Sequence, residues 1–468
     1  MATTTKQVNP GLVKGLVLMD ATTLVMGSMI GSGIFIVSAD ISRQVNSPGL
    51  LIVVWVATAL LTMVAALSYG ELAAAMPHAG GQYVYLREAF GPLTGFLYGW
   101  TMFLVIQTGT IAAVAVAFAK FVGVFFPSVS AQNYLFGAGK LGVTTQQLMA
   151  IATLVLLTAV NTRGLRTGAI VQNIFTVAKV AALLGLIGMG FFAGRNSQAV
   201  TANFTDFWRN ASWGWTTVQI VGVAMVGSLF SSDAWNNITF TGAEVRNPKR
   251  NLPLALALGV AAVSTLYILC NFVYLNVLTL DAIKTAAEDR VGTATAAAIL
   301  GPVAVQLMAA AIMISTFGCM NGLILAGARV YYAMALDGLF FKKVAQLDPV
   351  HRAPRTSLIV QCIWAALLTL SGTYNDLLDY VIFAVVLFYI ATITGLFVLR
   401  RTRPDMERPY KALGYPVLPA LYIVTAGMIE VLLLLYKPNY TWPGLIIVLL
   451  GIPVYFLWHR RSPARTTS

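Results

Sequence analysis

A glycine-rich segment in the first long apolar stretch has the composition of a binding site. Residues 27–35 read GSMIGSGIF, so Gly31 and Gly33 flank Ser32 near the middle of the stretch. Glycine has the lowest helix propensity after proline, which predicts an unwound turn here. The N–H groups that begin the following half-helix, together with its dipole, would bind a carboxylate. The alternative is a packing face for a neighbouring helix, because Gly27 and Gly31 form a G-x-x-x-G pattern.

A polar patch that contains an acid interrupts another apolar stretch. Residues 227–237 read GSLFSSDAWNN, with Asp233 near their centre. An ionisable side chain at membrane depth is costly and by default marks a functional site. The centre of the patch lacks glycine and proline, so a break in this helix is predicted from polarity alone. The alternative is a network of hydrogen bonds between packed helices.

Lys179 is the only Lys or Arg that lies well inside an apolar stretch. Lysines near helix ends can extend to the membrane surface, but Lys179 is far from both ends of its stretch. We therefore expect it to face the protein interior and to pair with backbone carbonyls or an acid. Extension to the surface is the alternative.

These features belong to a chain built almost entirely of membrane-spanning helices. Its 468 residues are 58% hydrophobic and 10% charged, with a mean hydropathy of +0.78, whereas soluble domains carry roughly 25% charged residues. Windows of about 19 residues are apolar enough to cross a bilayer core of ~30 Å. All must be helical, because a lipid-facing backbone satisfies its own hydrogen bonds. We predict about twelve spans: 16–39, 48–76, 93–126, 141–160, 168–194, 214–243, 252–280, 299–335, 356–373, 375–400, 415–436 and 440–459.

The two interruptions occupy corresponding positions. The glycine segment falls in the first predicted span and the patch around Asp233 in the sixth, which begins a second group of five. Paired interruptions of this kind indicate an inverted-repeat transporter with its site at the membrane midplane. The repeat itself is not visible as similarity between the two halves.

The net charge of +13 indicates membrane topology rather than a nucleic-acid partner. With a cytoplasmic N-terminus, about 21 of the 30 Lys and Arg residues fall in cytoplasmic segments and about 8 in outer loops, which is the positive-inside pattern. We expect a multi-pass protein of the inner (cytoplasmic) membrane with both termini in the cytoplasm. The predicted parts are a tail (1–15), a ten-helix transport core (16–410), two peripheral helices (411–459) and a second tail (460–468).

The sequence favours neither an enzyme nor a metal or cofactor site. It has no HExxH motif, paired-carboxylate site or Cys/His cluster at membrane depth. The histidines lie at predicted cytoplasmic ends: His78, His351 and His459. The cysteines lie inside predicted helices, away from any outer loop where a disulfide could form: Cys270, Cys319 and Cys362.

Short motifs along the chain resemble those of a known family. Besides residues 27–35 they are YGEL at 69–72, MPHAGGQYVY at 76–85, EVRNPKRNLP at 244–253, FGCMNG at 317–322, Ala328-Arg329, and RPDMERP at 403–409. In this order, from Asp20 to Trp458, the chain resembles the amino acid–polyamine–organocation (APC) superfamily. Within it, the chain is most similar to the L-type amino acid transporters and their bacterial relatives.

The resemblance implies an all-α membrane fold with a five-plus-five inverted repeat of the leucine-transporter type and two peripheral helices. It also implies a midplane site for an amino acid. The substrate carboxylate would meet the backbone at Gly31, Ser32 and Gly33. The substrate ammonium would meet main-chain carbonyls near the following residues: Met29, Ile30, Phe230, Ser231 and Asp233. Phe230 matches the aromatic residue that closes the site from outside in this family.

Lys179 matches a fifth-span lysine of the resembling family. That lysine reaches the place where related sodium-coupled carriers hold a cation. The groups expected around it are the carbonyls near Gly27 and Ser28 and the hydroxyls of Ser315 and Thr316. An ammonium is a compact charge with three donors, so it can replace a sodium ion. The resemblance therefore implies sodium-independent exchange of L-amino acids. Proton symport is one alternative, and an amino-acid-gated channel or receptor is an alternative from another class.

Two departures from the family pattern affect substrate and partners. Asp233 stands where many animal members have glycine, which makes a side-chain contact with the substrate or a bound cation possible. The outer loop after the third span lacks the cysteine by which animal members bind a glycoprotein subunit. We therefore expect no disulfide-linked heavy subunit and no cofactor, with amino acid substrates and the lipid bilayer as partners.

Overall fold

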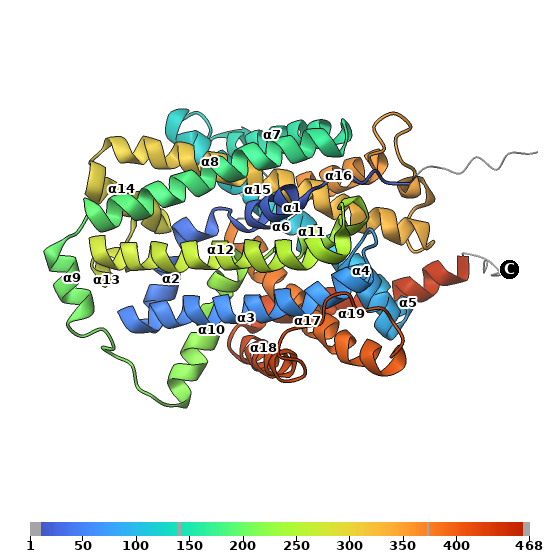
Figure 1. Cartoon of the computed structure of the whole chain (residues 1–468). Coiled ribbons are helices and arrows are strands. Elements are labelled where there is room, and N and C mark those ends of the chain that lie inside the picture. Colours follow the sequence, from blue (N-terminus) through green and yellow to red (C-terminus); the bar gives the residue numbers. More distant parts are fainter. Residues whose placement is uncertain (1–10, 138–141, 372–373, 462–468) are drawn as a thin grey trace, which may run out of the picture.

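Long helices that run in one common direction make up most of the molecule (Figure 1). The computed structural model describes residues 11–137, 142–371 and 374–461. Its helices are α1 (Leu18–Met29), α2 (Gly33–Val45), α3 (Pro48–Ala75), α4 (Gln82–Phe90), α5 (Pro92–Thr101), α6 (Gln107–Phe125), α7 (Thr145–Thr162), α8 (Leu165–Phe192), α9 (Ser197–Phe204), α10 (Trp215–Ser231), α11 (Asn237–Phe240), α12 (Pro248–Val277), α13 (Leu280–Lys284), α14 (Val291–Leu300), α15 (Val303–Leu336), α16 (Arg355–Ser371), α17 (Tyr374–Thr402), α18 (Val417–Tyr436) and α19 (Pro438–Arg461).

Shorter elements join the long helices. A π-helix, η1 (Met102–Ile106), continues α5 into α6. Two antiparallel strands, β1 (Tyr134–Phe136) and β2 (Val143–Thr144), precede α7. Three 3-10 helices lie in connecting segments: η3 (Gly242–Glu244), η4 (Ala287–Asp289) and η5 (Lys342–Ala345).

The structure is that of an all-α polytopic membrane protein, which confirms the predicted fold class. Within the described residues, nine helices are long and apolar enough to span a membrane, and the bent pair α1–α2 makes ten. The predicted count of twelve is not confirmed by this criterion. The predicted spans 214–243 and 356–373 correspond to α10 and α16, which have only 17 residues each. α10 is short because it ends at the polar patch around Asp233.

The two interrupted spans lie against each other in opposite directions. α1, the first half of one span, contacts α11, the second half of the other, while α2 contacts α10. Two spans that pair first half with second half run antiparallel, as an inverted repeat requires. The interruptions are therefore brought together.

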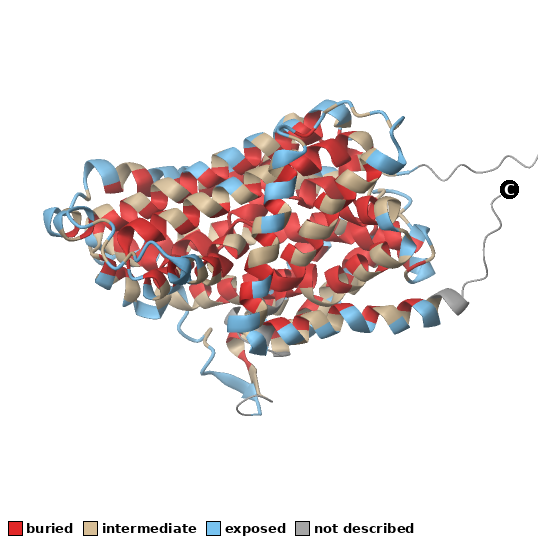
Figure 2. Cartoon of the chain, turned by 90° about the horizontal axis from the view of Figure 1, so that it is seen from below, coloured by how far each residue is buried: buried red, intermediate tan, exposed pale blue. Residues whose placement is uncertain are grey.

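Long helices enclose the interrupted spans. α12 packs against α1 and α3, and α15 packs against α1, α6 and α8. On the outside, α18 packs against α3, α10 and α17, and α19 against α5 and α17. Figure 2 shows buried residues along the length of the bundle and exposed residues concentrated at its ends and loops. The bundle therefore has a continuous interior in which a midplane site can be buried.

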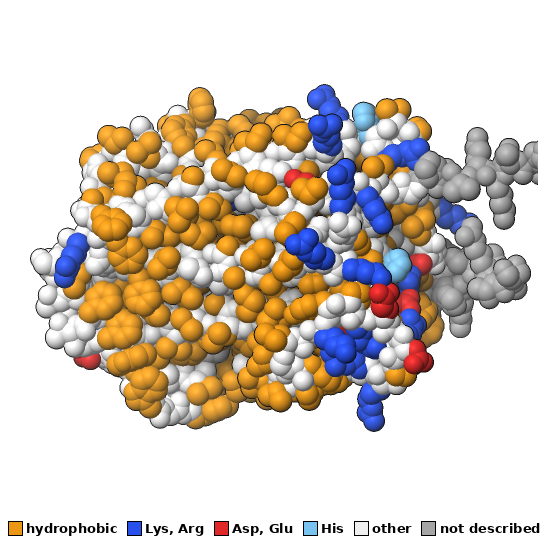
Figure 3. Space-filling view, in the orientation of Figure 1, with side chains coloured by type: hydrophobic (Ala, Val, Ile, Leu, Met, Phe, Trp, Pro, Cys, Tyr) orange, Lys and Arg blue, Asp and Glu red, His pale blue; other side chains and the backbone are white. Residues whose placement is uncertain are grey.

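Basic side chains gather at one end of this bundle. Figure 3 shows most of the visible Lys and Arg over the end where α4, α5 and α11 lie, while the flank is covered with apolar side chains. Apolar flanks between polar ends suit a bilayer. A one-sided basic end is what the positive-inside pattern produces.

Candidate functional site

The glycine segment forms a break between two half-helices. α1 ends at Met29 and α2 begins at Gly33, so Ile30, Gly31 and Ser32 lie between them. The two helix axes differ by 42°. The last carbonyls of α1 and the first N–H groups of α2 have no partners within their own helices. The break thus presents a partly negative helix end and a partly positive one to the same buried region.

Lys179 of α8 lies at the negative end of α1. Its Nζ is 2.6 Å from Gly27 O, 2.7 Å from Ile30 O and 3.2 Å from Ser315 O. Carbonyls can only accept and an ammonium has three donors, so the charged form of Lys179 satisfies all its donors here. The side chain is 1% exposed and does not extend to the membrane surface.

Two other residues predicted around Lys179 are placed differently. Ser315 offers its carbonyl to the ammonium, while its hydroxyl donates to Ile30 O at 3.1 Å and Gly31 O at 3.0 Å. The Thr316 hydroxyl donates to carbonyls one turn back in its own helix. A threonine in a helix readily bonds to its own backbone in this way.

The remaining carbonyls at the end of α1 also have partners. The Cys319 thiol of α15 donates to Ser28 O at 3.0 Å, whereas Lys179 bonds to the carbonyls of Gly27 and Ile30. The Tyr267 hydroxyl of α12 lies 3.1 Å from Met29 O and 3.1 Å from Ser231 O. One hydroxyl thus links the two interrupted spans. Because a carbonyl oxygen has two lone pairs, both of these carbonyls can accept a further donor.

The patch around Asp233 breaks the second span. α10 ends at Ser231, and the four-residue α11 begins at Asn237. Between them Ala234 has a φ of 64°, in a region that non-glycine residues rarely adopt. The Asp233 N–H donates to Phe230 O at 3.1 Å, which closes the last turn of α10. The break is therefore a defined turn with Phe230 and Asp233 at its edge.

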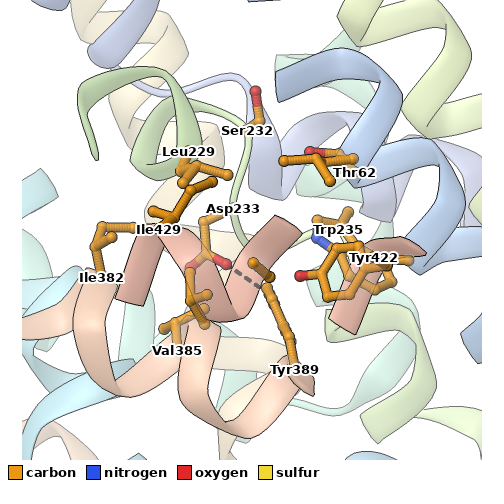
Figure 4. A pocket seen from close by; sticks show the side chains of 14 residues that line it. Thr62, Leu229, Ser232, Asp233, Trp235, Ile382, Val385, Tyr389, Tyr422 and Ile429 are labelled. Carbon is orange, nitrogen blue, oxygen red and sulfur yellow. Dashed lines mark hydrogen bonds between the residues drawn. The ribbon is translucent and has the colours of Figure 1, made fainter. Parts of the chain in front are cut away.

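The Asp233 carboxylate lies between two cavities. Its Oδ1 accepts a hydrogen bond from the Tyr389 hydroxyl of α17 at 2.6 Å. Figure 4 shows this pair at the wall of one cavity, beside Trp235 and Tyr422, with apolar residues of α3, α10, α17 and α18 around it. A second cavity, which also borders Asp233 and Tyr389, is lined by four side-chain amides: Gln82, Gln107, Asn236 and Asn237. Asp233 can thus contact a polar group in either cavity.

Gly31 and Gly33 differ in the room around them. A Cβ added at Gly33 would lie 2.1 Å from Ser231 Oγ, whereas one at Gly31 would lie 3.4 Å from Cys319 Sγ, an ordinary contact. α2 and α10 therefore pack closely at Gly33. The side chain of Ser231, rather than open space, lies next to it.

A buried ion pair joins α15 to η3, which follows the second interrupted span. Arg329 of α15 bonds to Glu244 of η3 through two hydrogen bonds, of 2.8 Å and 3.0 Å. Both side chains are at most 2% exposed. The N–H groups of Gly15 and Leu16 donate to Glu244 O, at 2.9 Å and 3.0 Å, and the Arg246 N–H donates to Leu16 O at 2.8 Å. The pair therefore ties α15 to the ends of both interrupted spans.

Ion pairs also join η4 to α2 and α6. Glu288 is 2.9 Å from Lys120 Nζ at the end of α6, and Asp289 is 2.7 Å from Arg43 of α2. The Lys120 ammonium, through its hydrogen bond, holds the pKa of Glu288 below its usual value. These pairs are largely exposed, so each contributes little alone. Their effect is to fasten η4 across α2 and α6.

Sequence reasoning missed the two tyrosines of the site. Tyr267 and Tyr389 lie in apolar helices. A tyrosine in such a helix can face either the lipid or the protein core, and the sequence alone does not distinguish the two. The available signal was weak: a buried tyrosine hydroxyl needs a partner, and only the packing of α12 and α17 shows which one.

Comparison with known proteins identifies the family. A family model described as amino acid permease matches residues 16–457. This chain belongs to the amino acid permease family. This permease is 31% identical to b(0,+)-type amino acid transporter 1 of Mus musculus, over 98% of its own length and 91% of the relative's. It is 30% identical to large neutral amino acids transporter small subunit 2 of Mus musculus and of Homo sapiens, over 95% of its own length and 81% and 80% of theirs.

These matches confirm the resemblance to the APC superfamily and to L-type transporters. The permease is a multi-pass membrane transporter and not an enzyme. Among the described residues, no group of three His, Cys, Asp or Glu side chains is placed to hold a metal ion. The chemistry available at the two breaks is recognition of charged and polar groups by backbone, ammonium and carboxylate.

Proposed function

We propose that this permease exchanges L-amino acids across the cytoplasmic membrane without sodium. The observation that carries the proposal is the Lys179 ammonium, bonded to Gly27 O, Ile30 O and Ser315 O between α1 and α15. In sodium-coupled carriers, carbonyls of an unwound helix bind the ion. Here a fixed positive charge already occupies such carbonyls. With every donor satisfied, Lys179 keeps its proton, which favours exchange over proton symport.

The substrate is held between the two breaks. Its carboxylate binds the first N–H groups of α2, at Gly31, Ser32 and Gly33, where the helix dipole favours an anion. Its α-ammonium binds carbonyls at the ends of α1 and α10. The carbonyls of Met29 and Ser231 support this arrangement, because each bonds to Tyr267 and can accept once more. Ile30, Phe230 and Asp233 border the same region.

Gly33→Leu is expected to abolish amino acid uptake. A side chain there would push α2 away from Ser231, only 2.1 Å from an added Cβ, and would displace the N–H groups that bind the carboxylate. Gly31→Ala is the matched control, because its Cβ finds room beside Cys319. Uptake by both variants is measured in proteoliposomes, after size-exclusion chromatography has shown that each is folded. Unchanged uptake by Gly33→Leu would contradict the carboxylate site.

Asp233→Gly is expected to weaken binding of cationic and hydroxylated amino acids more than that of leucine-like ones. A buried carboxylate needs a positive or donating partner, and hydrogen bonds to charged groups contribute about 1.5–3 kcal/mol. We expect about a tenfold or larger loss for cationic substrates. Competition against one labelled substrate measures the whole panel, with Tyr389→Phe as a control that keeps the carboxylate. Equal losses across the panel would make Asp233 structural.

Proton symport and an amino-acid-gated channel or receptor are the competing functions. Interrupted helices also line channels, so each of these functions would use the same two breaks. Counterflow separates these functions: internal unlabelled amino acid accelerates uptake by an exchanger but not flow through a channel. Accumulation driven by an inward pH gradient, without internal amino acid, would instead indicate symport.

The proposed topology places the basic end of the bundle and both termini in the cytoplasm. The grouping of Lys and Arg at that end supports this (Figure 3). We also propose that residues 16–410 form the transport core, that 411–459 are peripheral, and that no disulfide-linked heavy subunit is needed. Cys270 and Cys319 are buried in helices and Cys362 is half-buried in one. A thermal-shift screen against the twenty amino acids would identify the substrates.

A further inference from the structure

Glu430 of α18 differs from the other buried acids of the described chain. Its side chain is 6% exposed, and both carboxylate oxygens are buried without a hydrogen-bond partner. The other buried acids have partners: Glu71 bonds to Arg400, Asp233 to Tyr389 and Glu244 to Arg329. A carboxylate left without donors at membrane depth is unusual, because burial of a polar group without a partner is costly.

α18 brings Glu430 next to the cavity of Figure 4. Tyr422, Ala426 and Ile429 of α18 line that cavity. Glu430 follows Ile429 and lies four residues after Ala426, so it belongs to the edge of the same buried face. Tyr422, shown in Figure 4, lines this cavity together with Asp233 and lies two turns before Glu430 on α18.

No cation neutralises Glu430 among the described side chains. α10 carries no titratable residue. The described titratable groups on α18 and the helices packed against it are Tyr422, Tyr436 and Lys437 on or next to α18, Tyr69 and Glu71 on α3, Tyr389, Arg400 and Arg401 on α17, and Tyr455 on α19. None of them forms a hydrogen bond with the Glu430 carboxylate. An ionised Glu430 would therefore have no hydrogen-bond donor and no neutralising cation among the described side chains.

We propose that Glu430 is a proton-binding site of this permease. The carboxyl holds a proton in the buried arrangement described here and releases it to water when the cavity beside α18 becomes hydrated during transport. One O–H bond forms on binding and breaks on release, and no other bond changes. This proposal rests on the proposed amino acid exchange. It adds a dependence of the transport rate on pH that Lys179, with all donors satisfied, does not provide.

Infrared difference spectroscopy tests the proton directly and does not depend on transport. Unmutated protein at neutral pH is expected to show a C=O band of a protonated carboxyl that Glu430→Gln lacks. The matched control is Asp40→Asn, which removes an acid whose side chain is 53% exposed and should leave the band unchanged. The same band in Glu430→Gln would overturn the proposal, because the proton would then reside on another acid.

Counterflow at equal pH on both sides tests the consequence. Between about pH 5.5 and 8, we expect the unmutated rate to change at least about threefold as the carboxyl titrates. Glu430→Gln should show a flat profile, Glu430→Asp should restore a dependence on pH, and Asp40→Asn should match the unmutated protein. A wild-type profile retained by Glu430→Gln, or a flat profile in unmutated protein, would overturn the proposal. Absence of counterflow at every pH would instead refute the exchange function, and the infrared band would still decide the fate of Glu430.

Discussion

Lys179→Ala is expected to lower amino acid counterflow by about a hundredfold or more. The substitution removes the donor of three hydrogen bonds, and bonds to a charged group contribute about 1.5–3 kcal/mol each. Gly27 O and Ser315 O lose the donor that holds α1 against α15. The measurement is the initial rate of labelled uptake into preloaded proteoliposomes with matched amounts of protein.

Two further variants separate the charge of Lys179 from its packing. Lys179→Met keeps most of the side-chain length but has no ammonium, and it should be as inactive as the alanine variant. Lys343→Ala removes an exposed lysine and should retain full activity. Activity in Lys179→Met close to that of unmutated protein would show that the positive charge is not needed.

Arg329→Met is expected to destabilise the arrangement described here by about 3–5 kcal/mol, the usual cost of leaving one partner of a buried ion pair alone. Glu244 would lose its guanidinium partner while buried against α15, with only 1% of its side chain exposed. The melting temperature in detergent should fall, and counterflow should fall with it, because Glu244 also anchors Gly15 and Leu16. Differential scanning fluorimetry and uptake give the two measurements.

An exposed ion pair provides the comparison for Arg329. Lys249 and Glu407 are 2.7 Å apart, and their side chains are 55% and 73% exposed. Such surface pairs contribute about 0–1 kcal/mol, so Lys249→Ala should change the melting temperature little. The double variant Glu244→Gln with Arg329→Met should recover part of the loss, because no unpaired charge is then buried. An Arg329→Met variant as stable as Lys249→Ala would show that the buried pair does not hold this arrangement.

The positions of both helix interruptions could be predicted from local properties. Glycine weakens a helix wherever it lies, so the pattern around Gly31 and Gly33 locates the end of α1 without knowledge of its neighbours. Polarity located the second interruption, at Asp233, since an acid in an apolar span is unusual in any fold. The depth of Lys179 within its span likewise indicated that its ammonium faces the interior.

Features that depend on neighbouring helices could not be predicted. The predicted span 16–39 stops before the end of α2 at Val45, because the serines of α2 look like surface residues in the sequence. In the structure Ser42, which lies beyond the end of the predicted span, is fully buried. Whether Thr316 bonds to Lys179 or to its own helix, and whether Ser231 fills the space beside Gly33, is likewise set by tertiary packing.

Counterflow with and without sodium tests the central claim most directly. Proteoliposomes preloaded with unlabelled amino acid are diluted into labelled amino acid, with sodium in one arm and choline in the other. The account predicts equal uptake rates in sodium and in choline, and strong acceleration of uptake by internal amino acid. In Lys179→Ala, uptake should be almost completely lost with either cation. A strong sodium requirement in the unmutated protein would contradict the account, because the Lys179 ammonium would then not act in place of the bound cation.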